Sequence, residues 1–562
     1  MKKFLFFIII LIAAFLRLYQ LGNVPPSPDW DEAALGYNAY SILKTGRDEF
    51  GNFLPLSIRS FDDYKPPLYT YLTVPSVGLF GLTVWSTRLP SALMGILAVI
   101  GTYFLVQELL RFSKFKEPGT RNQELMKNLP LLSAALLAIS PWHIQFSRIA
   151  FEANIGVTVN IWALVFFFMG LRKKTQLLFS AFLFGLGFYA YHSERVFLPL
   201  LLLLLFCLFR KELFSAGLKK TVGLGVVIGL VTIAPLLTVT FSKTAFLRLK
   251  GTSSLSDQVS LLKRTANKIE EDKKAGNKIG ELIDNRRFVF VKTVLSGYLS
   301  HFSLRWLFMT GDNPRHHAPD MGLLYIWELP FLLYGIVVLA RFKGKLVGFL
   351  FGWILIAPVA ASPTSGLPHA IRTLVFLPVP QILTSMGLLS FLDSISSMKG
   401  TRFIPKRLGS VLEPFTIGIL SIIILFNFFH YFTLYFVFMN REYSQYWQYG
   451  MKEAVEYTES VKDKYKKIVV STRLEQSYMF YLFYLKYDPK KYLAQGGTKS
   501  GGFAEEHNAF DKYEFRWLFW DGETFDGNTL YVGSSIEMPH GNNAHITYLD
   551  GTPAIEIKDR KD

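Results

Sequence analysis

Long apolar runs recur along the chain from Phe4 to Phe438, separated by short polar and basic segments. A helix needs about twenty apolar residues to cross roughly 30 Å of hydrocarbon, so the runs predict about eleven transmembrane helices. The expected spans are residues 4–22, 88–110, 129–141, 155–171, 176–190, 196–209, 221–241, 322–341, 345–361, 372–395 and 412–438. The pattern therefore predicts an α-helical polytopic membrane protein.

Basic residues between the runs predict how the helices are oriented. Clusters of Lys and Arg occupy alternate loops, and short cytoplasmic loops carry the excess of these residues. The clusters lie at residues 2–3, 111–127, 172–174, 210–220, 341–345 and 399–407. We expect a protein of the cytoplasmic membrane with its N-terminus in the cytoplasm. The first apolar run has no small-residue cleavage site after it, so it is expected to remain as a span.

The loops without these basic clusters are expected to lie on the outer side of the membrane. These are residues 23–87, 142–154, 191–195, 242–321, 362–371 and the chain after about residue 439. Segment 30–44 has the pattern of an amphipathic helix, 66–87 is apolar but broken by prolines and predicts a helix in the membrane interface, and 244–290 predicts a surface helix pair.

The composition changes to that of a soluble protein after residue 438. KKIVVST and NTLYVGSS predict strands, SYMFYLFYLKY predicts a helix, and AHITYLDGTPAIEIK predicts a hairpin that turns at Asp550–Gly551. We expect two domains. Residues 1–438 form a transmembrane domain with large outward loops at 23–87 and 242–321, and residues 439–562 form a small extracytoplasmic α/β domain.

Composition and charge narrow the function. The chain has 562 residues, of which 51% are hydrophobic, and a formal net charge of +17. The basic residues lie in short clusters between apolar runs and not on one face of a domain, which argues against a nucleic-acid partner. The single cysteine, Cys207, excludes an intramolecular disulfide. No P-loop or dinucleotide-binding motif is present, so the sequence gives no sign of a nucleotide-binding site.

The first chemical candidate is DWDEAALGYNAY at residues 29–40, directly after the first span. An acidic pair at the membrane surface, Asp31 and Glu32, can deprotonate an acceptor hydroxyl, which is the role of a general base in glycosyl transfer. Acidic residues also stabilise the first turn of any helix through its dipole. The two interpretations have about equal weight from these residues alone.

The second candidate is FDDYKPPLYTYL at residues 61–72. Lys65 precedes two prolines, so a cation stands beside a rigid turn at the same membrane surface and can neutralise a leaving phosphate. A single lysine has a simpler interpretation than phosphate binding. Its side chain can extend from the apolar layer so that the ammonium reaches the membrane surface.

Both segments belong to a longer pattern that resembles a known family. D-E-A, G-Y-N-A-Y, D-E-F-G-N, Y-K-P-P-L-Y and R-L-P-S-A, between Asp29 and Gly95, resemble the bacterial branch of the protein O-mannosyltransferase superfamily, which are GT-C glycosyltransferases related to the lipid A aminoarabinose transferase. The resemblance is dense in the first hundred residues, looser to about residue 440, and weak or absent in the C-terminal domain.

The resemblance implies a glycosyltransferase that inverts the anomeric carbon and takes a sugar, mannose or a similar one, from a polyprenyl-phosphate donor outside the cytoplasmic membrane. The catalytic acid pair of the family falls on Asp31 and Glu32, with Asp31 as the base, and the phosphate ligand falls on Lys65. In the aminoarabinose branch a glutamate precedes that lysine and helps to hold a metal. Here Tyr64 occupies the position, so no cofactor is certain and a divalent metal stays open, with Asp63 and His316 as its candidates.

Other outward loops supply further candidates. Three arginines are expected to bind the donor phosphate, and six residues are expected to contact substrate. The arginines are Arg148, Arg195 and Arg372, and the substrate contacts are Tyr37, Tyr64, Tyr191, His192, Arg315 and His317. Each has a structural alternative, namely an Arg148–Glu152 salt bridge, an interfacial belt around His192 or a cation at the membrane surface for Arg372.

Two other functions remain open. An oligosaccharide ligase or polymerase would use the same kind of lipid-linked donor. A lipid or sugar transporter would need ionisable residues within its spans, whereas here they gather on one side. The acceptor, whether a protein, a lipid or a glycan, is not determined by the sequence.

Overall fold

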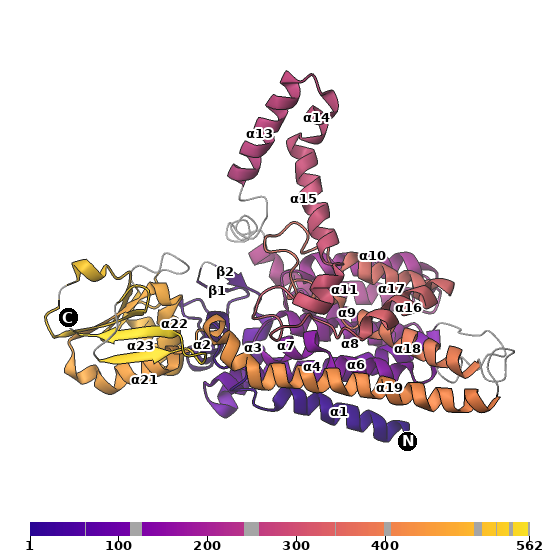
Figure 1. The fold of residues 1–562 in the computed structure, drawn as a ribbon, viewed down its shortest axis with the longest axis horizontal. Coiled ribbons are helices and arrows are strands. Elements are labelled where there is room, and N and C mark those ends of the chain that lie inside the picture. The colour runs from indigo at the N-terminus through magenta and orange to yellow at the C-terminus, as the bar shows by residue number, and fades with distance from the viewer. Residues whose placement is uncertain are drawn as a thin grey trace. The chain divides into compact units, whose positions relative to one another are not determined.

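The structure is a computed structural model that describes residues 1–61, 63–112, 126–240, 258–342, 344–397, 406–499, 508–523, 525–538 and 543–559 (Figure 1). The chain forms two compact units, each assembled from separated segments. The bundle unit comprises Met1–Ile9, Ala98–His143 and Gly156–Asn427, and the sheet unit comprises Ile10–Leu97, Ile144–Ile155 and Phe428–Asp562.

Every apolar run expected to span the membrane is helical over most of its length. The helices are α1 Lys2–Leu18, α4 Val84–Phe112, α6 Leu129–Ile139, α8 Ala153–Gly170, α9 Gln176–Gly187, α10 Glu194–Leu213, α11 Lys219–Thr240, α16 Glu328–Arg341, α17 Lys345–Ile356, α18 Val379–Ser397 and α19 Lys406–Thr433. The run 322–341 is the main exception at its start. There the chain makes a turn, in which the Tyr325 N–H donates to the Glu328 carboxylate at 3.3 Å, before α16 begins.

Five of the described helices are long and apolar enough to cross a membrane, and α6 with α7 (Pro141–Arg148), bent by 57°, makes a sixth if the pair counts as one span. The five are Val84–Phe112, Ala153–Gly170, Lys219–Val239, Leu374–Ser396 and Leu412–Trp447. The chain is thus a multi-pass helical membrane protein by length and composition. The expected number of eleven spans stays a prediction.

Small residues let helices of the bundle unit approach closely. α16 packs against α18, and a Cβ atom on either Gly335 or Gly387 would overlap the backbone of the opposite helix. Lipid tails are as apolar as the helices, so the hydrophobic effect does not drive helices together in a membrane. Helices there commonly associate through close backbone packing at glycine instead. In the same unit α9 packs against α11, and α10 packs against α17.

The sequence predicted a pair of surface helices in segment 244–290. The described residues of this region form three helices. These are α13 Gln258–Lys274, α14 Lys278–Ile283 and α15 Arg286–Ser300, and Figure 1 shows α13 and α15 side by side, joined through α14. Residues 244–257 of the expected segment lie outside the described residues. The short helices of the unit are η1 Trp306–Thr310 and η2 Leu374–Phe376.

The sheet unit contains most of the first outward loop. Its elements there are α2 Trp30–Thr45, the hairpin of β1 Ile58–Ser60 and β2 Asp63–Lys65, and α3 Leu68–Phe80. Further along the chain, η3 Leu434–Phe438, α20 Met439–Tyr443 and η4 Ser444–Trp447 continue α19, so the expected domain boundary at residues 438–439 falls within a helical run.

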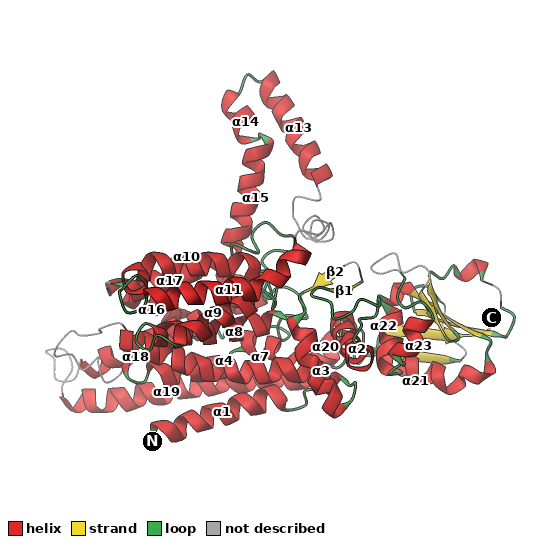
Figure 2. Ribbon diagram, turned by 180° about the vertical axis from the view of Figure 1, so that it is seen from behind, coloured by secondary structure: helices red, strands yellow, loops and turns green. Residues whose placement is uncertain are grey.

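A six-stranded sheet follows, shown in yellow in Figure 2. Its strand order is β4-β5-β3-β6-β8-β7, with β3 parallel to β5 and β6 and the other neighbours antiparallel. The strands are β3 Lys467–Ser471, β4 Asn508–Phe510, β5 Tyr513–Arg516, β6 Thr529–Ser534, β7 Ala544–Thr547 and β8 Pro553–Lys558. The helices are α21 Met451–Val461, η5 Lys462–Lys464, η6 Thr472–Leu474, α22 Ser477–Tyr484, α23 Pro489–Ala494 and η8 Trp520–Gly522.

The strands, helix and hairpin expected after residue 438 are therefore confirmed. The β7–β8 turn forms because Asp550 accepts hydrogen bonds from the Thr552 N–H and hydroxyl at 2.9 and 2.6 Å, while Gly551 takes a left-handed φ of +90°. Aspartate and glycine are suited to such turns for these two reasons.

One hydrophobic core joins the first outward loop to this sheet. Ala33, Tyr37 and Phe61 belong to the same buried cluster as Phe480 and Val532. α2 lies against α22 and α23, and at Gly36 an added Cβ would stand 2.7 Å from the Phe483 ring. The position of α2 thus depends on the C-terminal part of the chain.

Candidate active site

Helix α2 begins with a capping box that fixes the acidic pair in its first turn. The Asp29 carboxylate accepts from the Glu32 N–H at 2.9 Å, and the Asp29 N–H donates to the Glu32 carboxylate at 3.3 Å. This reciprocal arrangement satisfies backbone N–H groups that have no partner inside the helix. The helix ends at Gly46, which takes a left-handed φ of +71°.

Glu32 forms a fully buried ion pair with Arg88 of α4. Both carboxylate oxygens accept from the guanidinium, at 2.8 Å each, and neither side chain is exposed. The Ala150 N–H donates to the same carboxylate at 2.7 Å. A bidentate arginine pair fixes geometry as well as charge. Glu32 therefore holds α2, α4 and the 150 region together within the sheet unit.

Arg88 also organises the chain just before α2. Its guanidinium donates to the main-chain carbonyls of Leu21, Pro25 and Ser27, at 3.2, 2.9 and 2.8 Å. Together with the Glu32 pair, these bonds fold residues 21–27 around one buried cation. The arginine of the R-L-P-S-A motif thus positions the acidic motif that lies sixty residues earlier.

A short hairpin brings Lys65 to the same helix. In its antiparallel register Ile58 faces Lys65 and Ser60 faces Asp63. Pro66 and Pro67 follow at once and α3 begins at Leu68, so the direction of the chain after Lys65 is restricted by two fixed φ angles. Tyr69 anchors this helix, because its hydroxyl donates to the Thr87 carbonyl at 2.9 Å.

Asp31 and Lys65 meet at the start of α2. The Lys65 ammonium lies 2.8 Å from one Asp31 carboxylate oxygen and 3.8 Å from Asp63. The Lys65 side chain is 7% exposed, whereas the carboxylates of Asp31 and Asp63 remain 29% and 35% exposed. The arrangement combines a buried cation with a carboxylate that solvent or a ligand can reach.

The surroundings of Lys65 keep it charged. Burial by itself lowers the pKa of the ammonium, but the nearby carboxylates of Asp31, Glu152 and Asp63 outweigh it and raise the pKa above its ordinary value. Three carboxylates around one ammonium leave an excess of negative charge. An anionic ligand at Lys65 would therefore need further positive charge, or would have to displace Asp31 from the ammonium.

Among the described residues around Lys65, no group of three side chains suited to a metal is found. The Tyr64 N–H donates to the Asp63 carboxylate at 2.8 Å, and both Asp31 and Asp63 face the Lys65 ammonium. In the described residues, the one cluster of three side chains suited to a metal is Asp312, His316 and His369 of the bundle unit. Asp62 lies outside the described residues. Of the two metal candidates, Asp63 is thus beside Lys65 and His316 is in the bundle-unit cluster.

Arg148, expected to bind donor phosphate, is fully buried in the sheet unit. Its guanidinium donates to the carbonyls of Leu16 and Val24 at 2.8 and 3.0 Å and lies over the Phe436 ring at 4.8 Å. These contacts tie the end of α1 to the segment before α2. In this arrangement the guanidinium stabilises the fold around the site, and phosphate binding by it stays a prediction.

Tyr37, expected to contact substrate, is also buried, and its hydroxyl donates to the Tyr487 carbonyl at 3.2 Å. The next residue, Asn38, binds Glu49 twice. Its amide donates to the Glu49 carboxylate at 3.0 Å, and its carbonyl accepts from the Glu49 N–H at 2.9 Å. Thr498 and Tyr478 donate to the other carboxylate oxygen at 2.7 and 3.2 Å. The G-Y-N-A-Y and D-E-F-G-N motifs thus attach α2 and its following loop to the C-terminal part of the sheet unit.

The remaining candidates belong to the bundle unit. Tyr191, His192 and Arg195 lie at the turn between α9 and α10, where the rings of Tyr191 and His192 meet edge to face. Arg315 and His317 lie in the loop after η1. Arg372 precedes η2, and its guanidinium donates to the Thr364 hydroxyl at 2.6 Å and the Ser365 carbonyl at 2.7 Å. Their roles toward a substrate stay predictions.

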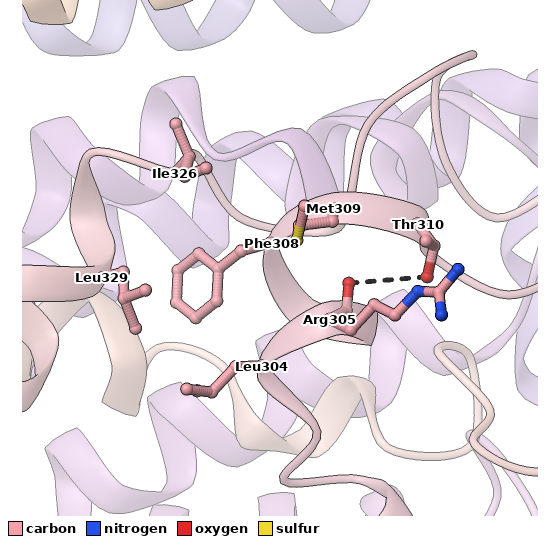
Figure 3. A pocket seen from close by; sticks show the side chains of 7 residues that line it. All are labelled: Leu304, Arg305, Phe308, Met309, Thr310, Ile326 and Leu329. Atoms are coloured by element: carbon pink, nitrogen blue, oxygen red, sulfur yellow. Dashed lines mark hydrogen bonds between the residues drawn. The ribbon is translucent and has the colours of Figure 1, made fainter.

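A pocket of about 420 Å³ also lies in the bundle unit. Figure 3 shows its lining, which is apolar except for Arg305 and Thr310: Leu304, Arg305, Phe308, Met309, Thr310, Ile326 and Leu329. The Thr310 hydroxyl donates to the Arg305 carbonyl at 3.4 Å. The lining contains no carboxylate, so the pocket offers no acid–base pair for chemistry.

Sequence reasoning missed two residues that shape the site, Arg88 and Glu49. Each stood in a motif already noticed, R-L-P-S-A and D-E-F-G-N, but a single charged residue in a motif does not reveal its partner. Arg88 stood at the first residue of the expected span 88–110, where an arginine can reach the membrane surface, whereas α4 begins at Val84 and holds Arg88 within the helix.

Comparisons with known proteins show which solved structures share the fold of this chain. Neither a protein-family model nor a curated protein matches the sequence. Solved structures do match. The apo structure of ArnT from Cupriavidus metallidurans is 13% identical, with 99% of this chain and 97% of that chain covered and a TM-score of 0.50. ArnT bound to undecaprenyl phosphate is 14% identical, with 99% and 98% covered and a TM-score of 0.51.

The chain has the fold of ArnT. At 13–14% identity this likeness shows the fold alone, and it is the fold expected from the motifs. The match to ArnT includes the C-terminal region, where the motifs had suggested little or no resemblance. The archaeal oligosaccharyltransferase AglB from Archaeoglobus fulgidus, in complex with an inhibitory peptide and a dolichol-phosphate, is 15% identical over 86% of this chain and 63% of that chain, with a TM-score of 0.48.

Proposed function

We propose that the chain is an inverting membrane glycosyltransferase that moves a sugar, mannose or a similar one, from a polyprenyl-phosphate donor to a hydroxyl or amine of an extracytoplasmic acceptor. The observation that carries the proposal is the pairing of a reachable carboxylate, Asp31, with a buried cation, Lys65, at 2.8 Å. A glycosyl transfer from a phosphate needs these two groups, one beside the nucleophile and one beside the leaving group.

In the proposed reaction Asp31 removes the proton of the acceptor. The acceptor oxygen or nitrogen then forms a bond to the anomeric carbon, while the bond from that carbon to the phosphate oxygen breaks. The electron pair of the broken bond leaves with the polyprenyl phosphate, and Lys65 stabilises the additional negative charge. The rate gain comes mainly from placing the reactants and from a cation that is already oriented in a site of low dielectric.

The pair has to separate for this reaction. With Lys65 bound to Asp31, the carboxylate is a weak base and the ammonium is neutralised. An arriving phosphate competes for the ammonium and releases Asp31 toward the acceptor. Donor binding thus prepares the base, which would limit proton abstraction to the state in which a sugar is present.

The other residues of the sheet unit have positioning roles in this proposal. Glu32 and Arg88 fix the first turn of α2, and Arg148 holds the segment before it, because their side chains are fully buried and bonded to protein groups. Tyr37 orients α2 against the C-terminal part. Tyr64, on the hairpin beside Lys65 and only partly buried, is the aromatic residue assigned to the sugar.

The bundle-unit candidates keep their proposed roles. Arg195 and Arg372 are assigned to the donor phosphate. The residues assigned to sugar or acceptor are Tyr191, His192, Arg315 and His317. The proposal also places the chain in the cytoplasmic membrane, with the N-terminus in the cytoplasm and residues 439–562 outside it.

The fold supports a lipid-linked donor. ArnT has been solved with undecaprenyl phosphate bound, and nearly the whole of this chain follows the ArnT fold. An oligosaccharide ligase or polymerase remains the alternative enzyme, because it would use the same donor chemistry. A transporter fits less well, since the paired carboxylate and ammonium lie at the start of α2 and not along a path through the spans.

The test uses the full chain in lipid nanodiscs, radiolabelled polyprenyl-phosphate mannose and a cell-envelope fraction. Label that moves to protein, lipid or glycan establishes transfer and identifies the acceptor class. Long products from an oligosaccharide donor would favour the ligase, and label that crosses a vesicle membrane without a new covalent product would favour the transporter. Repeating the assay with other polyprenyl-phosphate sugars covers the case in which mannose is not the donor.

Variants of two carboxylates near Lys65 sharpen the test. Asp31→Asn removes the proposed base, while Asp63→Asn removes one unit of charge from the other carboxylate near the same ammonium. We expect a loss of about 100-fold or more for the first and a much smaller change for the second. Equal losses would mean that Asp31 acts only through its charge.

A further inference from the structure

Two loops of the bundle unit bring a carboxylate and two imidazoles together. In the first loop, after η1, the Asn313 carbonyl accepts from the His316 N–H at 2.7 Å and the Asn313 side chain accepts from the Arg315 N–H at 2.9 Å. This turn folds His316 back over Asp312, so that its Nδ1 lies 3.0 Å from the Asp312 Oδ2.

The second loop, which precedes η2, supplies the third side chain. The Ala370 N–H donates to the Asp312 Oδ2 at 2.8 Å, and the His369 N–H donates to the His301 Nε2 at 3.2 Å. These two main-chain bonds place the His369 ring 5.1 Å from the His316 ring, with 37° between the ring planes. Residues more than fifty positions apart therefore meet in one buried cluster.

The cluster has the geometry of a metal site. One potential ligand atom from each of Asp312, His316 and His369 lies within 4.8 Å of the other two. Two further atoms are buried and have no hydrogen-bond partner, the Asp312 Oδ1 and the His369 Nδ1. A buried polar atom without a partner destabilises the fold, so two such atoms in one cluster point to a further bound group.

We propose that Asp312, His316 and His369 bind a divalent transition-metal ion, for which Zn²⁺ is the best match. Two imidazoles and one carboxylate are typical donors for zinc, whereas magnesium and calcium prefer oxygen ligands alone. Three protein ligands leave a fourth position for water or a ligand oxygen. The bound ion would join the loop after η1 to the loop that carries Arg372.

The main-chain contacts have the form of an outer coordination sphere. The Ala370 N–H orients the Asp312 carboxylate, and His301 fixes the backbone of His369. Such supporting hydrogen bonds are characteristic of metal sites and commonly change metal affinity about 10- to 100-fold. The proposal does not depend on Asp31 or Lys65, and it concerns a different place from the Tyr64 position discussed above.

The test measures metal directly, on the full chain in nanodiscs and with an affinity tag that contains no histidine. After treatment with EDTA and dialysis, the protein is titrated with Zn²⁺ and analysed by mass spectrometry of the metal. We expect about one zinc ion per chain and a higher unfolding temperature with zinc than with Mg²⁺. Co²⁺ at the same site should give the strong visible absorption of a tetrahedral site with nitrogen ligands.

His316→Gln and His369→Gln should each weaken zinc binding at least about 100-fold and abolish the cobalt absorption. His317→Gln is the matched control. Its ring is equally buried, but its Nδ1 bonds the Ala318 carbonyl and it lies outside the cluster, so zinc binding should persist. Wild-type protein that retains no zinc and shows no cobalt absorption would overturn the proposal without reference to any variant. Unchanged zinc binding in both cluster variants would overturn it as well.

Discussion

Asp31 and Glu32 are neighbours in the first turn of one helix, yet their surroundings are opposite. Glu32 is fully buried, and both of its oxygens are bonded to Arg88. Asp31 remains 29% exposed and faces Lys65 through one oxygen. Successive residues on a helix point about 100° apart, so one step along the chain separates a carboxylate that holds the fold from one that a substrate can reach.

The difference shows why two acidic residues in a motif need not share a chemical role. A buried bidentate pair has no free lone pair directed at a ligand and would lose much stability if it opened. A partly exposed pair can exchange its partner at low cost. We therefore expect changes at Glu32 to affect folding and changes at Asp31 to affect turnover, and the following predictions test that division in order of decreasing effect.

Glu32→Ala should lower the free energy of unfolding by about 3–5 kcal/mol, because it leaves the Arg88 guanidinium buried and unpaired. Asp31→Asn should lower it far less, since Lys65 keeps Asp63 and Glu152 nearby. Thermal unfolding of both variants in the same detergent measures the contrast. The double variant Glu32→Gln with Arg88→Met should recover part of the loss, and no recovery would mean that the buried pair is not the cause.

Glu49 is another buried carboxylate, and its protonation should make the stability of the fold depend on pH. Burial raises its pKa from 4.5 to about 7, although hydrogen bonds from Thr498 and Asn38 act the other way. The folded state therefore holds the proton more tightly than the unfolded state, and stability should fall by about 3 kcal/mol as the pH rises from about 4.5 to 7, then level off.

The difference between the wild-type and Glu49→Gln stability curves isolates this effect. Urea unfolding of the two proteins at a series of pH values should show the decline in the wild type and a smaller one in the variant. Parallel curves would contradict the shifted pKa of Glu49, whatever the other carboxylates contribute.

Lys65→Met should weaken donor binding and transfer about 10- to 100-fold, because a charged hydrogen bond to phosphate contributes about 1.5–3 kcal/mol. Lys65→Arg keeps the charge and should retain part of the activity, though its planar group does not match the geometry of an ammonium. Binding of polyprenyl phosphate without sugar, measured by displacement, distinguishes a loss of phosphate affinity from a folding defect. Unchanged affinity in Lys65→Met would remove Lys65 from the phosphate site.

Tyr37→Phe should have the smallest effect, a loss of about 1 kcal/mol in stability with near-normal turnover per folded molecule, because it removes one hydrogen bond to the Tyr487 carbonyl. The measurement compares thermal unfolding with the transfer rate of the same sample. A large rise in the substrate KM without a change in stability would instead restore Tyr37 as a substrate contact.

The sequence predicted much of the local structure because the signals were local. Apolar runs marked the helices, the acidic residues Asp31 and Glu32 marked the first turn of α2, and Asp550–Gly551 marked a turn. The meeting of Asp31 and Lys65 was expected from a family resemblance, because the hairpin that joins them depends on a register that the residues alone do not reveal.

Other features depend on contacts that are distant along the chain. The Arg88 partner of Glu32 is fifty-six residues away, and two partners of Glu49, Tyr478 and Thr498, are more than four hundred residues away, so these pairs could not be found from spacing. His316 contacts Asp312 four residues away, but His369, the third member of the cluster, is more than fifty residues away and could not be found from spacing either. Motifs indicate that a residue matters, but tertiary contacts decide whether it binds protein or substrate.

The central claim is that Asp31 removes the acceptor proton while Lys65 receives the phosphate, and the most direct measurement follows donor binding and sugar transfer together in the Asp31→Asn variant. The account predicts that the variant folds, binds the polyprenyl-phosphate sugar at least as tightly as the wild type and transfers it about 1,000-fold more slowly. A variant that transfers sugar at a rate near that of the wild type would contradict the assignment of the base.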